Sequence, residues 1–184
     1  MSAWSRLLDT LVRERGPALF GYAYVLTGDK DRAEDLLQDA LVRTFRSGRA
    51  LGSLDSAHAY VKRAITTAFI DSGRREAARP KRDGVDILDR PGVAVSPDPS
   101  GRVDDAVDLR AALLSLAPRE RACVVLRYLE DLPVAHVAST LGLAEGTVKR
   151  YLSDGVARLR AAAPGVEFTE VETVGVHTHS GGSR

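Results

Sequence analysis

The segment Leu132–Leu159 reads LPVAHVASTLGLAEGTVKRYLSDGVARL and contains two stretches of regularly spaced apolar residues, separated by Gly142. Apolar residues recur at helical spacing on both sides of that glycine: Val134, Val137, Ala138 and Leu141 before it, and Val148, Leu152, Val156 and Leu159 after it. Pro133 suits a first helical turn, where its missing N–H costs nothing, and Gly142 suits a left-handed C-terminal cap. The spacing predicts a helix-turn-helix whose second helix begins near Ala144.

The second helix of such a unit enters the major groove of DNA with its first turns against the bases. The residues offered there are Glu145, Thr147, Lys149, Arg150, Tyr151 and Ser153. Lys149 and Arg150 suit phosphates or guanine, whereas Thr147 and Glu145 suit a thymine methyl or a cytosine amine. The alternative is a helical hairpin with a solvated charged face. The glycine turn, the spacing and the run Gly146-Thr147-Val148-Lys149 favour DNA binding.

The composition bounds the class of protein. The 184 residues are 44% hydrophobic and 28% charged, which fits one or two small domains. No apolar run approaches membrane-spanning length and the N-terminus lacks an apolar signal core, so we expect a cytoplasmic chain without membrane contact. One cysteine excludes an internal disulfide, and the apolar surroundings of Cys123 predict a buried, inert thiol.

The net charge of +1 conceals a segregation of charge. Basic residues crowd the segment 74–82, and acidic residues dominate the segment 29–39. Separate basic and acidic surfaces indicate two kinds of partner.

Three helices are predicted in the first half. The first is interrupted or restarted at Gly16-Pro17, and the second begins with Asp31 as its cap, completed by Glu34. One side of the second helix carries a polar strip of Asp35, Gln38 and Asp39, although a solvated face has the same pattern. After a loop at Ser47–Ser56, a third helix runs from about 57 to about 78, capped by Asp55 or Ser56.

The third helix combines basic side chains with an aromatic residue. Its exposed side is expected to carry Lys62, Arg63, Arg74 and Arg75, with Tyr60 near its start. Cations for phosphates and a ring for stacking suit single-stranded nucleic acid. A basic helix end that complements the helix dipole explains the same pattern, and the residues alone leave both open.

Proline and glycine forbid long elements over residues 80–103, so we expect a flexible linker between a domain at 1–79 and a domain at 104–163. Residues 164–184 have no helical period and are expected to form a mobile tail. No cysteine or third histidine lies near His177 and His179, so a polar tail is favoured there over a metal site. No catalytic dyad, cofactor motif or metal site is predicted.

The two halves together resemble the extracytoplasmic-function (ECF) group of bacterial sigma-70 RNA polymerase sigma factors. In the first half the resemblance rests on LTGDKDRAEDLLQDALVRTF (Leu26–Phe45), which is similar to the polymerase-docking segment of that family. In the second half it rests on Leu116–Arg160, which resembles the promoter-reading domain. It covers roughly residues 7–160, the linker excepted.

The resemblance implies an all-α fold of two helical domains, of sigma region 2 and region 4 type, and a dissociable subunit of RNA polymerase rather than an enzyme. Asp35, Gln38 and Asp39 would dock on the clamp helices of the polymerase, and its flap is a further expected contact. A DNA-melting helix would face the −10 element with Tyr60, Lys62, Arg63, Thr67, Asp71, Arg74 and Arg75. The recognition helix would place Glu145, Thr147, Lys149, Arg150, Tyr151 and Ser153 at the −35 element. Many relatives are restrained by an anti-sigma factor.

Three positions depart from the usual pattern of the family. Thr67 stands where asparagine is common, Ala144 replaces a serine cap, and Tyr151 replaces an arginine. These changes bear on promoter sequence more than on the class of function. The main rival is a transcription regulator with a response-regulator-type helix-turn-helix, which requires an N-terminal α/β domain.

Overall fold

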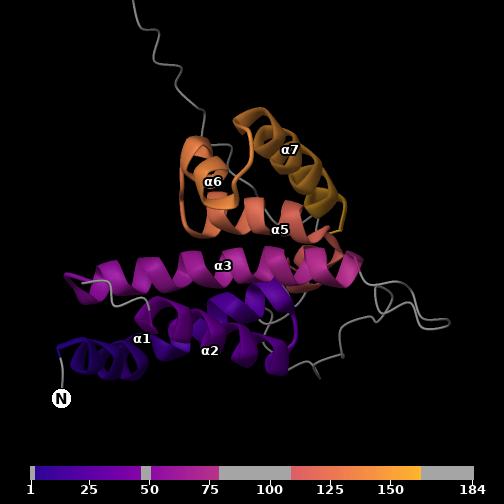
Figure 1. The fold of residues 1–184 in the computed structure, drawn as a ribbon. Coiled ribbons are helices and arrows are strands. Elements are labelled where there is room, and N and C mark those ends of the chain that lie inside the picture. The colour runs from indigo at the N-terminus through magenta and orange to yellow at the C-terminus, as the bar shows by residue number, and fades with distance from the viewer. Residues whose placement is uncertain (1–2, 47–50, 79–108, 163–184) are drawn as a thin grey trace, which may run out of the picture.

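The computed structural model describes residues 3–46, 51–78 and 109–162, and over these ranges the chain is helical without a strand (Figure 1). The elements are α1 (Ala3–Thr27), α2 (Lys30–Arg46), α3 (Leu54–Ala78), a helical stretch at 109–115, α5 (Pro118–Val124), the π-helical turn η2 (Val125–Leu129), α6 (Val134–Leu141) and α7 (Glu145–Ala162). The expected all-α fold is confirmed, and the strands that the rival regulator requires are absent from the described part of the first half. The expected linker at 80–103 and tail at 164–184 lie outside the described residues.

Helices α1, α2 and α3 pack side by side as an N-terminal bundle (Figure 1). Leu11, Leu19 and Leu26 of α1 and Ile65 of α3 are completely buried between them. Burying side chains of this size supplies most of the stability of a small helical domain.

The expected break in the first helix is wrong, because α1 continues through Pro17. A proline inside a helix removes one hydrogen bond and costs about 3 kcal/mol. Leu11 lies before this position and Leu19 after it, and both are fully buried. A continuous helix through Pro17, which is itself exposed, keeps both leucines in one core and offsets that cost.

The predicted caps of the second and third helices are also displaced. Asp29, not Asp31, caps α2, because its Oδ1 accepts the N–H of Arg32 at 2.8 Å. Ser53 caps α3, since its Oγ accepts the N–H of Ser56 at 3.1 Å, so that α3 begins at Leu54 rather than near residue 57. In both cases the side-chain oxygen meets the N–H three residues onward, which is the geometry of an N-cap.

The second half is a helical unit with its own core. Pro133 is the N-cap of α6 rather than part of its first turn, and Gly142 ends α6 at a φ of 62°, as predicted. Val148, Leu152, Val156 and Leu159 of α7 are all buried, which confirms the predicted inner face. The helix-turn-helix is therefore present with its expected register.

The two halves also touch each other, with α5 and α6 lying on α3 (Figure 1). Ala122 and Val125, from the second half, are 0% and 2% exposed and belong to the apolar core of the N-terminal bundle. The second half therefore packs directly on the N-terminal bundle, and this contact between the two halves is called the seam below.

Candidate nucleic-acid interface

The outer face of α7 is open along the first three turns of the helix. Glu145, Lys149 and Ser153, spaced four residues apart, are exposed on one line of the helix, and Arg150 is exposed beside them. Lys149 makes no ion pair within the described ranges. The structure thus places four of the six predicted groove-facing residues outward.

The other two predicted residues of α7 are half-buried. The ring of Tyr151 packs against the core of the second half, and Thr147 is partly covered. The Arg150 guanidinium lies 5.4 Å from the centroid of the Tyr151 ring, a cation–π distance. Tyr151 therefore supports the arginine next to it and has less surface to offer a base.

The start of α7 is fixed by backbone hydrogen bonds. Leu143 donates its N–H to Ala138 at 3.0 Å, and Val148 donates to the Ala144 carbonyl at 3.1 Å. Ala144 has no side-chain oxygen, so no capping bond of the kind that serine makes is available. Further along, Gly155 allows close approach to α5, since a Cβ there would lie 3.0 Å from Cγ2 of Val124.

Helix α3 offers a more mixed surface. Arg63 and Thr67 are exposed, whereas Tyr60 and Asp71 are half-buried. The Thr67 hydroxyl donates to the carbonyl of Arg63 at 2.9 Å. Arg74 and Arg75 lie in α3, but their side chains are outside the described part of the structure.

The sequence predicts Lys62 on the exposed side of the third helix, but in the structure this lysine is largely covered. Its Nζ donates to both carboxylate oxygens of Glu130, at 2.7 and 2.8 Å, and the two side chains are only 22% and 19% exposed. The same Nζ lies 5.2 Å from the ring centroid of Tyr22. The pKa of Tyr22 is raised by burial, so its hydroxyl stays neutral beside the lysine.

Glu130 was missed from the sequence as a member of this site. It lies 68 residues from Lys62 and on the other half of the chain. Neither helical periodicity nor a local motif links positions so far apart, so no sequence signal marks this pair.

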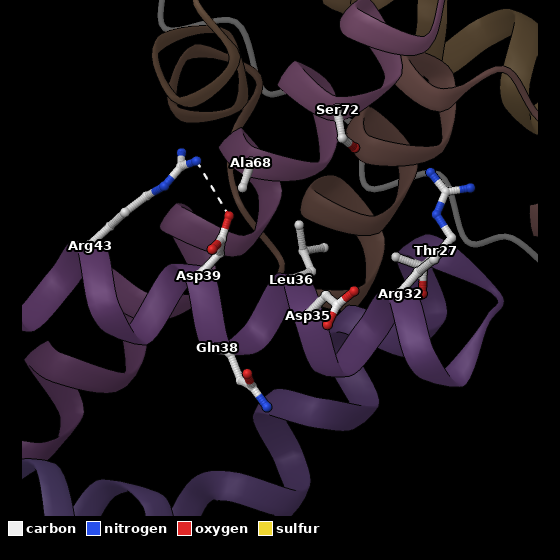
Figure 2. A pocket seen from close by; sticks show the side chains of 9 residues that line it. All are labelled: Thr27, Arg32, Asp35, Leu36, Gln38, Asp39, Arg43, Ala68 and Ser72. Atoms are coloured by element: carbon white, nitrogen blue, oxygen red, sulfur yellow. Dashed lines mark ion pairs between the residues drawn. The ribbon is translucent and has the colours of Figure 1, made fainter.

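The polar strip of α2 borders an open hollow of about 400 Å³ (Figure 2). Asp35, Gln38 and Asp39 are all exposed along it. Two arginines also line the hollow, and Arg43 forms an ion pair with Asp39 at 3.5 Å (Figure 2). The surface around the strip therefore carries both carboxylate and guanidinium groups and is not purely acidic.

An apolar groove adjoins this hollow and was not anticipated. Gln38 lines both, and the other groove residues are Trp4, Leu8, Val12, Leu41, Val42, Phe45 and Arg46. Trp4, Val12 and Val42 are 56%, 47% and 59% exposed, which is unusual for large apolar side chains gathered in one place. Such a patch is typical of a protein-binding surface. The sequence carried a signal for this patch, because Trp4, Val12 and Val42 are apolar residues that lie outside the buried faces of α1 and α2.

Two segments of the chain match known family models. The Sigma-70 region 2 model matches residues 11–79, and the Sigma-70, region 4 model matches residues 106–159. The chain is 35% identical to the RNA polymerase sigma-E factor of Streptomyces avermitilis, over 83% of this chain and 82% of that protein. It is 32% identical to the ECF RNA polymerase sigma factor SigL of Mycobacterium tuberculosis, over 86% and 90%. The chain belongs to the ECF group of the sigma-70 family.

Further similarities of this sigma factor agree with that assignment. It is 34% identical to the ECF RNA polymerase sigma factor SigE of Mycolicibacterium smegmatis, of which it spans 61%. A solved structure of the sigma factor RpoE in complex with the anti-sigma factor NepR, from Bartonella quintana, matches with a TM-score of 0.62 and 26% identity. That match covers 89% of this chain and 97% of the other, so the likeness extends over both halves.

Cys123 is the one cysteine of the sigma factor, and it is buried. Burial raises the pKa of the Cys123 thiol to about 12, so it remains protonated and is a poor nucleophile. Within the described ranges, no three His, Cys, Asp or Glu side chains gather where they could hold a metal ion. No described helix is long and apolar enough to cross a membrane.

Proposed function

We propose that this sigma factor is a non-catalytic, dissociable initiation subunit of RNA polymerase that reads two promoter elements and acts in the cytoplasm. The observation that carries the proposal is the division of α7 into two faces. Its apolar side is buried in a core, while Glu145, Lys149, Arg150 and Ser153 are outward on a helix of the length that a major groove accepts.

At the −35 element we assign α7 to the major groove. Arg150 and Lys149 suit the N7 and O6 acceptors of guanine or the phosphates, and Glu145 suits a cytosine amine. Thr147 and Ser153 are further contacts, and Tyr151 positions Arg150. This assignment depends on duplex DNA, because the groove offers its pattern of donors and acceptors only when the bases are paired.

At the −10 element we assign α3 and the loop before it to DNA melting. Stacked bases are hidden in a duplex, so trapping an extruded base favours strand separation at a cost of a few kcal/mol. Lys62 and Arg63 would hold the phosphates, with Tyr60, Thr67 and Asp71 beside the strand. Arg74 and Arg75 continue the same helix in sequence.

For core polymerase we assign the strip of Asp35, Gln38 and Asp39 to the clamp helices, with the flap as a contact of the second half. The neighbouring apolar groove with exposed Trp4 and Val42 supports a protein partner at this face. An anti-sigma factor is proposed as a further partner, as the Bartonella quintana sigma factor was captured with one. We propose domains at 1–79 and 104–163 that are joined by the linker at 80–103.

Run-off transcription tests the proposed function. Core polymerase from the same host is mixed with the purified full-length chain and genomic fragments, and start sites are mapped. We expect transcripts that begin at a defined set of promoters and are absent when the chain is omitted. A complete lack of initiation on all fragments would refute the proposal.

Asp35→Arg tests the docking surface. Reversing this exposed charge should reduce affinity for core polymerase at least tenfold, because like charges at a docked surface cost several kcal/mol. Affinity is measured by fluorescence anisotropy of labelled full-length chain titrated with core polymerase. Asp9→Arg, at an exposed acid on α1, is the matched control. Equal affinities of Asp35→Arg and Asp9→Arg would contradict the assignment.

A further inference from the structure

The recognition helix α7 packs closely on α5 (Figure 1). Gly155 of α7 is buried where the two helices cross, and a Cβ there would lie 3.0 Å from Cγ2 of Val124 and 3.7 Å from Cδ1 of Leu116. The lack of a side chain at Gly155 therefore lets the two helices approach closely. This crossing determines the distance between α7 and α5.

The inner face of α7 makes apolar contacts. Four apolar side chains of the helix are buried there: Val148, Leu152, Val156 and Leu159. Apolar burial is non-directional, so it holds α7 against the core without selecting one angle. A hydrogen-bonded ion pair is directional and defines an angle more sharply.

An ion pair joins α7 to α5. Nη1 of Arg158 donates to Oε2 of Glu120 at 2.5 Å, three residues beyond Gly155. The partners differ in exposure, since the Glu120 side chain is 8% exposed and that of Arg158 is 55% exposed. The pair therefore consists of a buried carboxylate on α5 and a cation that reaches it from the surface of α7.

The carboxylate of Glu120 is itself held in place. Its Oε2 also accepts the backbone N–H of Ala117 at 3.2 Å, at the start of α5. Hydrogen bonds to a charged acceptor are shorter and stronger than neutral ones. Without Arg158, the buried carboxylate would lose a charged partner, which favours a tilt of α7 that restores its contact with water.

The pair and the predicted DNA contacts lie on opposite sides of the crossing along α7. At a rise of about 1.5 Å per residue, Arg158 is about 4.5 Å past Gly155, and Lys149 is about 9 Å before it. A tilt of about 10° about the crossing therefore moves the backbone at Lys149 by about 1.6 Å. Hydrogen bonds to base edges need donor–acceptor distances of about 3 Å, so a movement of this size is enough to lose them.

Helical geometry also separates Arg158 from the exposed line of α7. Arg158 follows Lys149 by nine residues, which is about two and a half turns, so the two side chains leave the helix on opposite sides. A basic side chain on a recognition helix is an expected phosphate contact. In this structure the guanidinium of Arg158 instead binds the carboxylate of Glu120.

We propose that Glu120 and Arg158 form a positioning pair, which sets the tilt of α7 on α5 and thereby aligns Lys149 and Arg150 with the −35 element. Arg158 acts on the DNA through Glu120 and does not itself bind a phosphate. The effect on promoter binding rests on the proposed function, whereas the effect on the angle between the two helices does not.

Glu120→Gln distinguishes positioning from phosphate binding by the sign of its effect. The variant keeps Arg158, raises the net charge by one, and retains an oxygen that can accept the N–H of Ala117. If Arg158 bound a phosphate, its release from the carboxylate would strengthen promoter binding. Positioning predicts roughly three- to tenfold weaker binding, because misaligned contacts to base edges are partly lost.

The measurement uses holoenzyme assembled from core polymerase and the full-length chain. A fluorescent promoter duplex found by run-off is titrated with holoenzyme at fixed salt. Asp131→Asn is the matched control, because it also raises the net charge by one and removes the acid of an ion pair in the second half, with Arg127. It should change affinity less than about twofold. Equal affinities of the two variants, or stronger binding by Glu120→Gln, would overturn the proposal.

Further variants test whether the two residues act as a pair. Arg158→Gln should weaken binding as Glu120→Gln does, and Arg158→Lys should retain most of the affinity. With both residues changed to glutamine, the loss should equal that of one single variant, because the second change removes nothing further. Losses that multiply would show independent roles and would refute the pair.

The discrimination between DNA sequences separates alignment from general weakening. The ratio of affinities for promoters with an intact and a scrambled −35 element should fall in Glu120→Gln. Loss of a phosphate contact, or a purely structural role in a chain that remains folded, leaves this ratio unchanged. An unchanged ratio would therefore contradict the positioning role.

A measurement without polymerase or DNA tests the tilt itself. Residual dipolar couplings of backbone amides in the full-length chain give the angle between α5 and α7. This angle should change by several degrees in Glu120→Gln and stay constant in Asp131→Asn. If Glu120→Gln unfolds the second half, as judged by circular dichroism, Arg158→Gln replaces it, since Arg158 is more than half exposed. An unchanged angle in a folded variant refutes the positioning pair.

Failure of this proposal and failure of the proposed function give different results. If the unmodified chain does not initiate in run-off transcription, the proposed function is wrong, and the angle between α5 and α7 still reports on the pair. If the chain initiates and Glu120→Gln binds the promoter more tightly, the positioning pair alone is refuted.

Discussion

Helices α3 and α7 are both proposed to bind promoter DNA, but they differ in how much of their outer surface the rest of the chain covers. On α7 the outer face is open and Lys149 has no ion-pair partner within the described ranges. On α3 the side chain of Lys62 is only 22% exposed, and its Nζ forms an ion pair with Glu130 from the second half. One of the two proposed DNA-binding surfaces is therefore open in the folded chain, and the other is partly covered by Glu130.

The difference follows from which core holds each helix. The apolar face of α7 packs against the core of the second half, and its outer face is left to solvent. Helix α3 packs on α1 and α2 with one side and on α5 and α6 with another. A helix with two packed sides has less surface for DNA, and part of that surface depends on whether the halves are together.

The largest effect is expected from Leu159→Ala, which tests whether α7 has an independent core. Leu159 is fully buried, so its truncation should cost about 2–5 kcal/mol of stability in the second half. Amide hydrogen exchange read by mass spectrometry, helix by helix, is the measurement. Protection should fall in α5 to α7 and stay nearly constant in α1 and α2.

Leu129→Ala is the control for Leu159→Ala. Leu129 is 58% exposed and at the end of η2, so the same truncation should change stability by less than about 0.5 kcal/mol. A loss of protection in α1 and α2 as large as that in α7 would show that the two cores unfold as one, which would contradict an independent core for α7.

Arg150→Ala measures how much the open face of α7 contributes to DNA binding. If Arg150 contacts a base, affinity for duplex DNA carrying the −35 element of a promoter found by run-off should fall by about 1–3 kcal/mol. Arg13→Ala removes the same charge from an exposed site on α1 and should have no comparable effect. A purely phosphate contact would instead weaken all sequences alike and reduce the salt dependence.

Gly28→Ala disturbs the seam that covers α3. Gly28 has a φ of 71°, where a side chain costs about 1–2 kcal/mol, and the new methyl group would also displace Leu114. We expect a lower midpoint of thermal unfolding. Gly21→Ala, within α1 with no atom near its Cβ, should instead raise stability by about 0.5–1 kcal/mol. Equal shifts in both variants would argue that Gly28 is not constrained by the seam.

Much of the fold could be predicted from the sequence because its signals are local. Val148, Leu152, Val156 and Leu159 share one face of a helix by spacing alone, and Gly142 marks a turn that requires a positive φ. The predicted cap positions were off by two or three residues, because Asp, Ser and their neighbours are all competent caps. Pro17 was misjudged since the benefit of a continuous helix lies in tertiary burial.

The candidate site was predictable only where one helix carries it. The outward residues of α7 and the strip on α2 follow from helical periodicity. The ion pair of Lys62 with Glu130 does not, because it joins residues brought together by packing of the two halves. The apolar groove has the same origin, since it forms between the start of α1 and the end of α2.

The smallest expected effect concerns His58, on α3 near the seam. Its Nε2 is buried without a hydrogen-bond partner in the described part of the chain. Burial lowers the pKa of His58 below 6.5, helped by the charges of Lys62 and Arg15 and opposed by those of Glu130 and Asp55. The unfolded chain therefore binds a proton more readily than the folded one.

The sign of the pH dependence follows from this difference. Well above pH 6.5, His58 is neutral in both the folded and the unfolded chain and does not change the free energy of unfolding. As the pH falls from there through the lower pKa of the folded state, the unfolded chain binds the proton first, so stability is lost. We expect urea unfolding midpoints to fall between pH 7.5 and pH 5, and to fall less in His58→Gln. His136→Gln, at an exposed histidine of α6, is the matched control. If the two variants have the same pH profile, the covered side of α3 imposes no penalty on a charge, and the contrast with the open face of α7 is reduced to Lys62 alone.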